Sequence, residues 1–468
     1  MIVSMEQCEI EVKDMITGNL QGKKVSVIGA ARSGVAAARL LQTHGAKVFV
    51  SDSGSEEKLK ENLADIQNFG INYETGNHSQ RVFDADLIVV SPGVPSNVPI
   101  LQEAERRDIQ IVSELELASW FCAAPMIGVT GTNGKTTTTM LIGRILQDGR
   151  KKNIVGGNIG TAFSSFVDTL DAQSIAVLEV SSFQLDYSHT FHPKVSILLN
   201  VTPDHLDRYD HNFEKYIASK CRIFENQTRE DVLIYNYDDE ETREHVRRLA
   251  SLHVRTLAFG KERQFEEGAF VDEEALVTIV GGRRSEVIPI DQISIRGMHN
   301  LYNAMAATLA AQIFEVGIPS VRATLKNFKG VEHRLEFVRE VHGVKYVNDS
   351  KATNVDSVWY ALQSFSEPII VLLGGRDKGN DYSRLFDLVE RHVKAIVAIG
   401  ESAEKVYEEF HAMKPTVRAS SMEEAVSAAT KFASPGDVVL LSPACASFDW
   451  FTNYEHRGQV FKKIVNAI

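Results

Sequence analysis

A short apolar run that stops at glycines occurs three times along the chain, and it constrains the fold more than any other feature. The three copies are KKVSVIGAARSG from Lys23, PMIGVTGTNGKTT from Pro125 and PIIVLLGGRDKGND from Pro368. Runs rich in β-branched residues that end in a glycine loop are typical of buried parallel strands, and the loop then leads into a helix. Similar runs alternate with helical patterns such as GVAAARLLQTHG and AEKVYEEFHAM. This alternation predicts α/β domains with parallel sheets, and three glycine loops predict three domains.

The expected domains are residues 1–113, 114–330 and 331–468. A chain of 468 residues is long enough for roughly two to four domains, each with its own core. The highly charged segment 225–296 ends in EEALVTIVGGRRSEVIPI, in which two alternating runs flank Gly281 and Gly282. This pattern predicts a β-hairpin, which we expect to extend the middle domain as an antiparallel addition.

Charge and cysteine content narrow the class of protein. The net charge of -12 argues against a nucleic-acid partner or an anionic membrane surface, because both usually require a basic face. The four cysteines lie far apart in sequence, so neither a disulfide framework nor a cysteine metal site is expected. The N-terminal stretch is acidic and mixed, and no run approaches the ~18 apolar residues of a membrane span. We expect a cytoplasmic monomer without a membrane span.

The stretch VTGTNGKTTTTM, residues 129–140, predicts a phosphate-binding loop. Gly131 and Gly134 permit unusual backbone angles, and a helix that begins near Lys135 would present free N–H groups to phosphate. Lys135 adds a positive charge, and Thr136 or Thr137 offers a hydroxyl to Mg²⁺. The usual loop has a further glycine at the position of Val129. The alternative, a glycine turn before an ordinary helix, fits poorly because threonine is a mediocre helix former.

Two polar side chains follow neighbouring strands of the predicted middle domain. Glu179 ends the strand in LEVSSFQLD, where a buried carboxylate is costly unless it is paired or bound to metal. The carboxyl ends of strands in α/β sheets face the ligand, and Mg²⁺ prefers oxygen ligands, so Glu179 is a candidate metal ligand. Capping of the next turn is the alternative. His205, in the polar loop NVTPDHLDRY, is a second candidate, although most loop histidines are merely solvated.

Three polar loops in the last third predict a receptor for a small dicarboxylate. They are NDSKATNVDS, LLGGRDKGND and LLSPACASFDWFTNYEHRG, and each follows a predicted strand. Such polar density at strand ends is typical of binding loops. The candidate amino-acid-binding residues are Lys351, Thr353, Lys378, Ser447 and Tyr454.

The sequence GVTGTNGKTT resembles the nucleotide loop of the Mur ligases and of their relatives, the folylpolyglutamate synthetases. That family has its glycine three residues before the last one, so Val129 is expected there. DSKATN together with SPACASFD resembles the D-glutamate-adding members, and the resemblance covers nearly the whole chain. It implies a Rossmann-like N-terminal domain, a central P-loop-type ATPase domain and a Rossmann-like C-terminal domain.

The resemblance also implies roles that the residues alone do not reveal. Lys220 would be an ordinary surface lysine by residue statistics, but the family carries a carbamylated lysine at the matching place. Arg334, in GVEHRLEF, matches a phosphate clamp, although it could equally form an interdomain ion pair. The implied catalytic residues are Lys135, Glu179, His205, Lys220 and Arg334. The resemblance implies two Mg²⁺ ions, close to Thr136, Glu179, His205 and Lys220 as a carbamate. The implied ATP-binding residues are Gly131, Thr132, Asn133, Gly134, Lys135, Thr136, Thr137, Asn300, Arg334 and Asp349.

The first glycine loop, GAARSG at residues 29–34, is a poor dinucleotide fingerprint because Ala31 replaces its middle glycine. Asp52 nevertheless follows a strand as an acidic ribose partner would. In the family that the chain resembles, this domain holds the uridine diphosphate of the substrate. The implied contacts are Arg32, Ser33, Asp52, Ser53, Ser91, Pro92, Gly93, Asn158 and His205.

The resemblance therefore implies an ATP- and Mg²⁺-dependent ligase of cytoplasmic peptidoglycan precursor synthesis. It would join D-glutamate to UDP-N-acetylmuramoyl-L-alanine through an acyl phosphate and release ADP and phosphate. Three alternatives stay open: another Mur ligase, a folylpolyglutamate synthetase, and a non-catalytic nucleotide-binding module that links two α/β domains.

Overall fold

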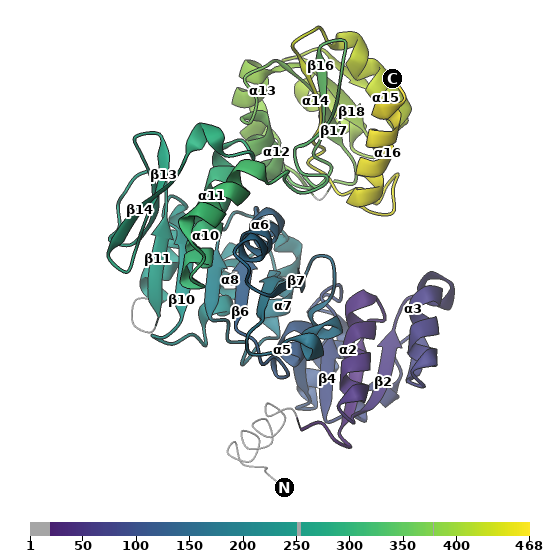
Figure 1. Ribbon diagram of the computed structural model, residues 1–468. Helices are drawn as coiled ribbons and strands as arrows, with labels where there is room; N and C mark the ends of the chain where they lie inside the picture. Colours follow the sequence, from purple (N-terminus) through teal and green to yellow (C-terminus); the bar gives the residue numbers. More distant parts are fainter. Residues whose placement is uncertain (1–18, 250–253, 378) are drawn as a thin grey trace. The chain divides into compact units, whose positions relative to one another are not determined.

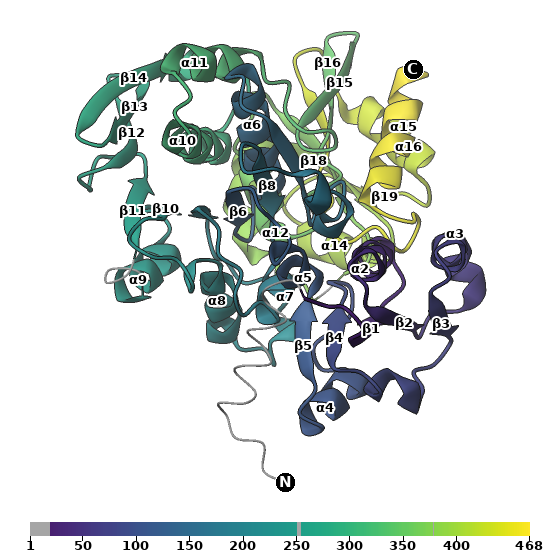
Figure 2. The same cartoon turned by 60° about the horizontal axis from the view of Figure 1, so that its bottom comes forward.

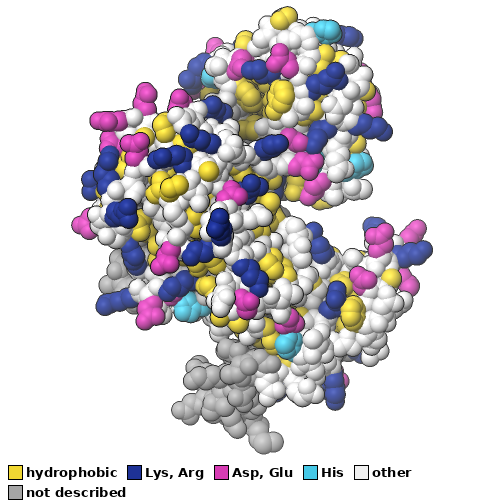
Figure 3. Space-filling view, viewed as in Figure 1, with side chains coloured by type: hydrophobic (Ala, Val, Ile, Leu, Met, Phe, Trp, Pro, Cys, Tyr) yellow, Lys and Arg dark blue, Asp and Glu magenta, His cyan; other side chains and the backbone are white. Residues whose placement is uncertain are grey.

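The computed structural model describes residues 19–249, 254–377 and 379–468 (Figure 1). The chain divides into two compact units. Unit 1 comprises Met1–Pro289 with Ala304–Thr324, and unit 2 comprises Ile290–Asn303 with Leu325–Ile468. Within the described residues, no helix has the length and apolar character needed to cross a membrane. On the face drawn in Figure 3, basic and acidic side chains are interspersed.

The first sheet of unit 1 is fully parallel, with strand order β3-β2-β1-β4-β5. Helices connect consecutive strands, as the alternating sequence pattern predicted. The strands are β1 (Lys24–Ile28), β2 (Lys47–Asp52), β3 (Asn72–Thr75), β4 (Leu87–Val90) and β5 (Gln110–Ser113). The helices are α2 (Arg32–Thr43), α3 (Glu56–Asn68), η1 (Gln80–Phe83), α4 (Pro99–Arg106) and α5 (Glu114–Ser119).

The second sheet of unit 1 has nine strands in the order β14-β13-β12-β11-β10-β9-β6-β8-β7. It is parallel from β7 to β12, and its last three strands are antiparallel. The strands are β6 (Met126–Thr130), β7 (Asn153–Gly157), β8 (Ile175–Glu179), β9 (Val195–Leu198), β10 (Val232–Asn236), β11 (Arg255–Phe259), β12 (Gly268–Asp272), β13 (Ala275–Val280) and β14 (Arg283–Pro289). The predicted hairpin is confirmed: Gly281 and Gly282 have φ of 59° and 72°, as a tight β13–β14 turn requires.

Helices flank this second sheet and bury its parallel strands. They are α6 (Lys135–Asp148), α7 (Ser182–Asp186), α8 (Phe213–Cys221) and α9 (Glu240–Leu249), with short 3₁₀ turns η2 (Phe163–Ser165), η3 (Val167–Thr169), η4 (Leu206–Arg208) and η5 (Arg222–Phe224). One apolar core runs from the first sheet to the second, because Leu115 and Leu117 of α5 and Phe163 of η2 all belong to it. Figure 2 shows α5 beside β5 and α7. The two sheets therefore form one compact unit.

Unit 2 is built on a six-stranded sheet with the order β15-β16-β20-β17-β18-β19. Only the β15–β16 pair is antiparallel. The strands are β15 (Glu336–Val341), β16 (Val344–Asn348), β17 (Ile369–Gly374), β18 (Val393–Ile399), β19 (Thr416–Arg418) and β20 (Val438–Leu441). The helices are η6 (Ile290–Gln292), α12 (Val355–Leu362), η7 (Ser383–Leu385), α13 (Phe386–His392), α14 (Ala403–Phe410), α15 (Met422–Phe432) and α16 (Tyr454–Asn466). Helices α10 (Met298–Ile313) and α11 (Ile318–Asn327) contribute to both units.

Three α/β sheets, two of them with antiparallel edge strands, match the predicted fold class. The cores on the two faces of the unit 2 sheet are separate, one below α12 and α13 and the other below α15 and α16. This is the arrangement expected when buried parallel strands carry helices on both sides.

Candidate active site

The predicted phosphate loop connects β6 to α6 in unit 1. Gly131 has φ of 149° and Gly134 has φ of 85°, so both use backbone angles that side chains disfavour. A Cβ atom at Gly131 would lie 3.0 Å from the Leu199 Cβ. The loop is tied to the end of β9, because the Thr132 N–H donates to the Asn200 carbonyl at 2.9 Å. The predicted loop and helix start at Lys135 are therefore present, and the loop is held in place by the neighbouring strand.

Two lysine side chains converge on one carbonyl of this loop. The Lys135 ammonium donates to the carbonyls of Gly131 and Thr132, both at 2.8 Å. The Lys220 amine donates to the same Gly131 carbonyl at 2.9 Å and is 2% exposed. Burial, and then the nearby charge of Lys135, hold the pKa of Lys220 well below its usual range. A lowered pKa favours the neutral amine, which is a nucleophile.

Glu179 ends β8 and is 3% exposed. Its two carboxylate oxygens accept from the Thr136 hydroxyl at 2.7 Å and from the Asn158 amide at 3.1 Å. The Thr137 hydroxyl is buried and has no hydrogen-bond partner among the described residues. Hydroxyl and carboxylate oxygens are the ligands that Mg²⁺ prefers, so these side chains fit that ion chemically.

His205 lies in the loop after β9. It has φ of 53°, its backbone N–H donates to the Asp204 carboxylate at 2.9 Å, and its ring meets the edge of Phe183 at 5.1 Å. Arg208, which the sequence interpretation missed, stacks over Phe183 and donates to the carbonyls of Pro92 and Gly93 at 3.3 and 3.2 Å. The loop after β9 thus reaches the loop after β4, although its residue types offered no signal for this contact.

A cavity of about 1120 Å³ opens in unit 1 at the carboxyl ends of the first sheet's strands. All the residues predicted to contact UDP line it, except His205. Asp52 shapes one wall, since its carboxylate accepts from the backbone N–H groups of Ala30 and Gly54, both at 2.6 Å. Gly34 allows the close approach of α2, because a Cβ there would lie 1.8 Å from the Gly29 carbonyl. The sequence interpretation missed other lining residues, namely Asn77, His78, Gln80, Glu103 and Arg106.

The predicted phosphate clamp and its neighbours lie in unit 2. Asp349 is 1% exposed and accepts from the Leu335 N–H at 3.2 Å and from the Ser442 hydroxyl at 2.8 Å. Burial raises the pKa of Asp349 to about 6, against the opposing charge of Arg334. The Arg334 Nε is buried and has no hydrogen-bond partner in the described parts of the chain. Asn300 lies in the first turn of α10, where it accepts from Asn303 at 3.1 Å.

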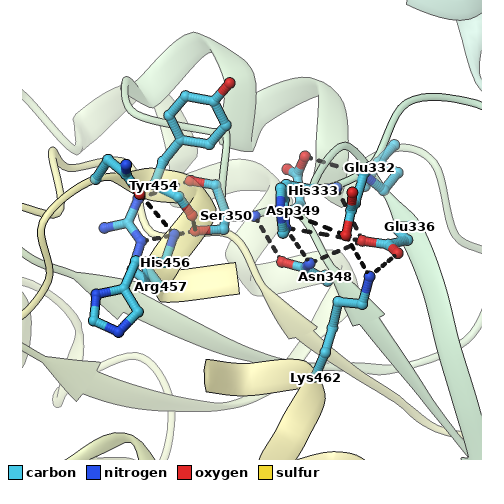
Figure 4. A network of polar contacts seen from close by, with 12 residues as sticks. Glu332, His333, Glu336, Asn348, Asp349, Ser350, Tyr454, His456, Arg457 and Lys462 are labelled. Carbon is cyan, nitrogen blue, oxygen red and sulfur yellow. Dashed lines mark hydrogen bonds and ion pairs between the residues drawn. The ribbon is translucent and has the colours of Figure 1, made fainter. Parts of the chain in front are cut away.

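The predicted amino-acid-binding loops meet in unit 2 around one buried arginine (Figure 4). Arg457 of α16 donates to the Ser350 hydroxyl and carbonyl at 2.9 and 2.7 Å and to the Cys445 carbonyl at 3.1 Å. Ser350 in turn donates to the Tyr454 carbonyl at 2.8 Å, and the Lys351 ammonium lies 5.3 Å from the Tyr454 ring centre. The loop after β16, the loop after β20 and the start of α16 are therefore joined.

Three family models match successive parts of the chain. They are the Mur ligase MurD-like, N-terminal domain at residues 23–113, the Mur ligase middle domain at residues 129–311, and the Mur ligase, glutamate ligase domain at residues 333–445. The chain belongs to the Mur ligase family.

This Mur ligase is similar along nearly its whole length to proteins named UDP-N-acetylmuramoylalanine–D-glutamate ligase. That of Salinibacter ruber is 46% identical, and the match covers 97% of this chain and 100% of the relative. That of Chloroherpeton thalassium is also 46% identical, with 95% and 98% covered. Among solved structures, the UDP-N-acetylmuramate-alanine ligase MurC of Thermotoga maritima has a TM-score of 0.59 at 19% identity, covering 95% of this chain and 99% of that one. That likeness shows the shared fold.

Many of the predicted site residues of this Mur ligase fall into three groups. Thr136, Glu179 and Asn158 are in contact, and Lys135 and Lys220 share the Gly131 carbonyl. The cavity gathers the residues predicted for UDP except His205, and unit 2 gathers Lys351, Ser447 and Tyr454 in its joined loops, with Thr353 in the loop that follows β16. The predicted residue Lys378 lies outside the described residues.

Proposed function

We propose that this Mur ligase joins D-glutamate to UDP-N-acetylmuramoyl-L-alanine and converts ATP to ADP and phosphate. The relatives that match nearly the whole chain carry the name of this activity. One structural observation carries the proposal: Asn158 both lines the large cavity and donates to Glu179 beside the phosphate loop. A nucleotide-linked substrate in the cavity would therefore end next to the site of phosphate chemistry.

The proposal assigns one role to each predicted domain. Residues 1–113 would bind the UDP part of the substrate, residues 114–330 would bind ATP, and residues 331–468 would bind the amino acid. We propose that the protein acts as a monomer, with all proposed site residues supplied by one chain. ATP and nucleotide-linked precursors are cytoplasmic compounds, so the proposed location is the cytoplasm.

The proposed reaction activates a poor electrophile. The alanine carboxylate of the substrate attacks the γ-phosphate of ATP, which forms an acyl phosphate and releases ADP. The amine of D-glutamate then attacks the acyl carbon, phosphate leaves, and the amine loses a proton to give the amide. The first step brings several negative charges together, so charge compensation and positioning should supply most of the rate gain.

The residues of the phosphate loop are suited to that compensation. The Lys135 ammonium donates to the backbone carbonyls of Gly131 and Thr132, and it can exchange these bonds for bonds to phosphate oxygens. Backbone N–H groups at the start of α6 would bind the same phosphates. Mg²⁺, which Thr136 and Glu179 would hold, would supply further positive charge. Arg334, with its buried Nε, is the proposed cation from the amino-acid-binding side.

Lys220, as a carbamate, is a further proposed metal-site residue. The amine is buried and its pKa is lowered, so it can react as the free base with CO₂. The C–N bond forms, a proton leaves, and the positive charge of an ammonium is replaced by a carboxylate-like group. An anionic oxygen group suits a hard metal ion near the loop, whereas an ammonium would repel it. His205 is proposed to act in the same site.

The deciding experiment measures phosphate release with UDP-N-acetylmuramoyl-L-alanine, ATP, Mg²⁺ and a panel of D- and L-amino acids. Release is expected with D-glutamate only, because fixed partners would bind both carboxylates and the amine at once. Equal turnover with L-glutamate, or better turnover with L-alanine or a diamino acid, would make this a different Mur ligase. Turnover of a folate without the uridine substrate would instead support a folylpolyglutamate synthetase. The absence of any amino-acid-dependent release would support a non-catalytic module.

A further inference from the structure

A chain of three polar side chains ends at the large cavity of unit 1. Ser51 lies on β2 directly opposite Glu74 on β3, because the two strands pair in parallel with these residues in register. The Ser51 Oγ donates to the Glu74 Oε1 at 2.7 Å. The same Oγ lies 2.7 Å from the Nδ1 of His78, in the loop after β3. Glu74, Ser51 and His78 therefore form one hydrogen-bonded relay.

The relay determines which ring nitrogen of His78 carries the proton. A serine hydroxyl has one hydrogen, and here it points to a carboxylate. Burial works against ionisation of Glu74, but the hydrogen bonds from Ser79 and Ser51 outweigh it and lower the pKa of the carboxyl. The Ser51 oxygen must then accept its second bond from the Nδ1–H of His78. Burial also lowers the pKa of the imidazole, in spite of the carboxylates of Asp52 and Glu74, which favours the neutral ring at neutral pH. A neutral ring protonated at Nδ1 has a hydrogen-bond acceptor at Nε2.

Only the outer end of the relay reaches the cavity. His78 lines it together with Asn77, Asp52 and Ser53, whereas Ser51 is fully buried and Glu74 is not part of the lining. Nδ1 is used by Ser51, and no hydrogen bond within the described residues involves Nε2. Nε2 is therefore the ring nitrogen left to accept a hydrogen bond from a ligand N–H or O–H group in the cavity.

We propose that His78 is a further substrate-binding residue, whose Nε2 accepts a hydrogen bond from the uridine of the substrate, and that Ser51 and Glu74 hold the ring in this tautomer. This role rests on the proposed function. Uridine offers two kinds of donor, the imide N–H of the base and the ribose hydroxyls. If the base is the donor, cytosine is disfavoured, since its N3 is an acceptor and would face another acceptor. Ser51 and Glu74 are positioning residues and need not contact the substrate.

The tautomer can be measured directly in the full chain. The enzyme is labelled with ¹⁵N-histidine, and the His78 signals are assigned by their absence from His78→Phe. The expected spectrum at neutral pH shows a neutral ring with its proton on Nδ1. Ser51→Ala removes the acceptor of that proton, so the population protonated at Nε2 should increase. A wild-type ring protonated at Nε2 would overturn the inference, whether or not Ser51→Ala folds.

Binding supplies the second test, by titration of the full chain with UDP. His78→Phe keeps a ring of similar size without an acceptor and should weaken UDP binding about tenfold, which is the value of one well-placed hydrogen bond. His78→Gln places an amide oxygen near the position of Nε2 and should recover part of the loss. His44→Phe is the matched control, because His44 pairs with Asp168 and does not line the cavity. It should bind UDP as the parent does.

Two analogues identify the donor. N3-methyl-UDP lacks the imide N–H, and 2′-deoxy-UDP lacks one ribose hydroxyl. One of these analogues lacks the group that donates to His78. The parent enzyme should bind that analogue about tenfold more weakly than it binds UDP. His78→Phe should bind that analogue no more weakly than it binds UDP. In turnover, His78→Phe should raise KM for the uridine substrate and leave kcat and KM for D-glutamate within about twofold.

These experiments distinguish a failure of the role proposed for His78 from a failure of the proposed function. Unchanged UDP affinity in His78→Phe would refute the role of His78 and leave the proposed function intact. A parent enzyme that binds NADH but not UDP would refute both.

Discussion

Removal of the Arg457 side chain should loosen the amino-acid-binding end of unit 2. Arg457 is 1% exposed, and its guanidinium donates to the backbone carbonyl of Ser350 (Figure 4) and to that of Cys445. Burial lowers its pKa to about 10, so it is still charged at neutral pH. Arg457→Met keeps a long apolar side chain but leaves both carbonyls without this donor. At about 1–3 kcal/mol for each unsatisfied buried group, the gross loss is about 2–6 kcal/mol. Removal of a buried charge offsets part of it, so we expect about 3 kcal/mol.

Unfolding and kinetics together test this prediction. Urea unfolding is followed by tryptophan fluorescence, to which Trp359 and Trp450 of unit 2 contribute. KM for D-glutamate should rise about tenfold or more, because the loops that carry Lys351 and Ser447 lose their shared anchor, while KM for the uridine substrate should change little. Arg457→Lys restores one donor and should fall between the parent and Arg457→Met.

The control for Arg457 is an exposed arginine of the same unit. Arg391 is 64% exposed in an ion pair with Asp387, so Arg391→Met should alter stability by no more than about 0.5 kcal/mol. If Arg457→Met unfolds at the same urea concentration as the parent and has the same KM for D-glutamate, the guanidinium does not anchor the loops and the reasoning fails.

Three further variants test the phosphate loop, the buried lysine and the buried aspartate. Lys135→Ala should abolish phosphate release and keep the parent's circular dichroism spectrum, and activity within a few-fold of the parent would show that the loop does not bind ATP. Lys220→Ala should lose most activity and regain part of it with added formate or acetate; a fully active variant would contradict the carbamate. For Asp349, the pKa is about 6 in the folded state and 3.8 for an ordinary aspartate, so between these values the folded state binds more protons and stability falls as pH rises. The fall is about 3 kcal/mol at about 1.4 kcal/mol per unit, and Asp349→Asn should remove this slope from urea unfolding between about pH 4 and 6; an unchanged slope would contradict the raised pKa.

The local sequence pattern was sufficient to predict the features whose physical cause lies in neighbouring residues. The β6–α6 loop was predicted from its glycines because φ values such as 149° at Gly131 are open to few other residues. The β13–β14 hairpin followed from alternation around Gly281 and Gly282. The parallel sheets followed from buried strands that alternate with amphipathic helices. Other assignments, such as Lys220 and Asn300, came from resemblance, since their residue types carry no distinguishing signal by themselves.

The tertiary structure decided whatever depends on residues far apart in the chain. The division into two units could not be predicted, because α5 and η2 join the first two sheets through apolar contacts that no periodicity encodes. The Arg457 anchor, 107 residues from Ser350, looked like an ordinary helix residue.

The sequence by itself determined the strand–loop–helix units, the glycine loops and the family resemblance, because these depend on neighbouring residues. Only the tertiary structure decided the chemical state of the side chains. Burial and Lys135, 85 positions away in the sequence, lower the pKa of Lys220, and the proposed tautomer of His78 depends on Ser51, which pairs with Glu74 across two strands. Desolvation and proton sharing depend on what surrounds a group in space, and that information exists only once the chain has folded.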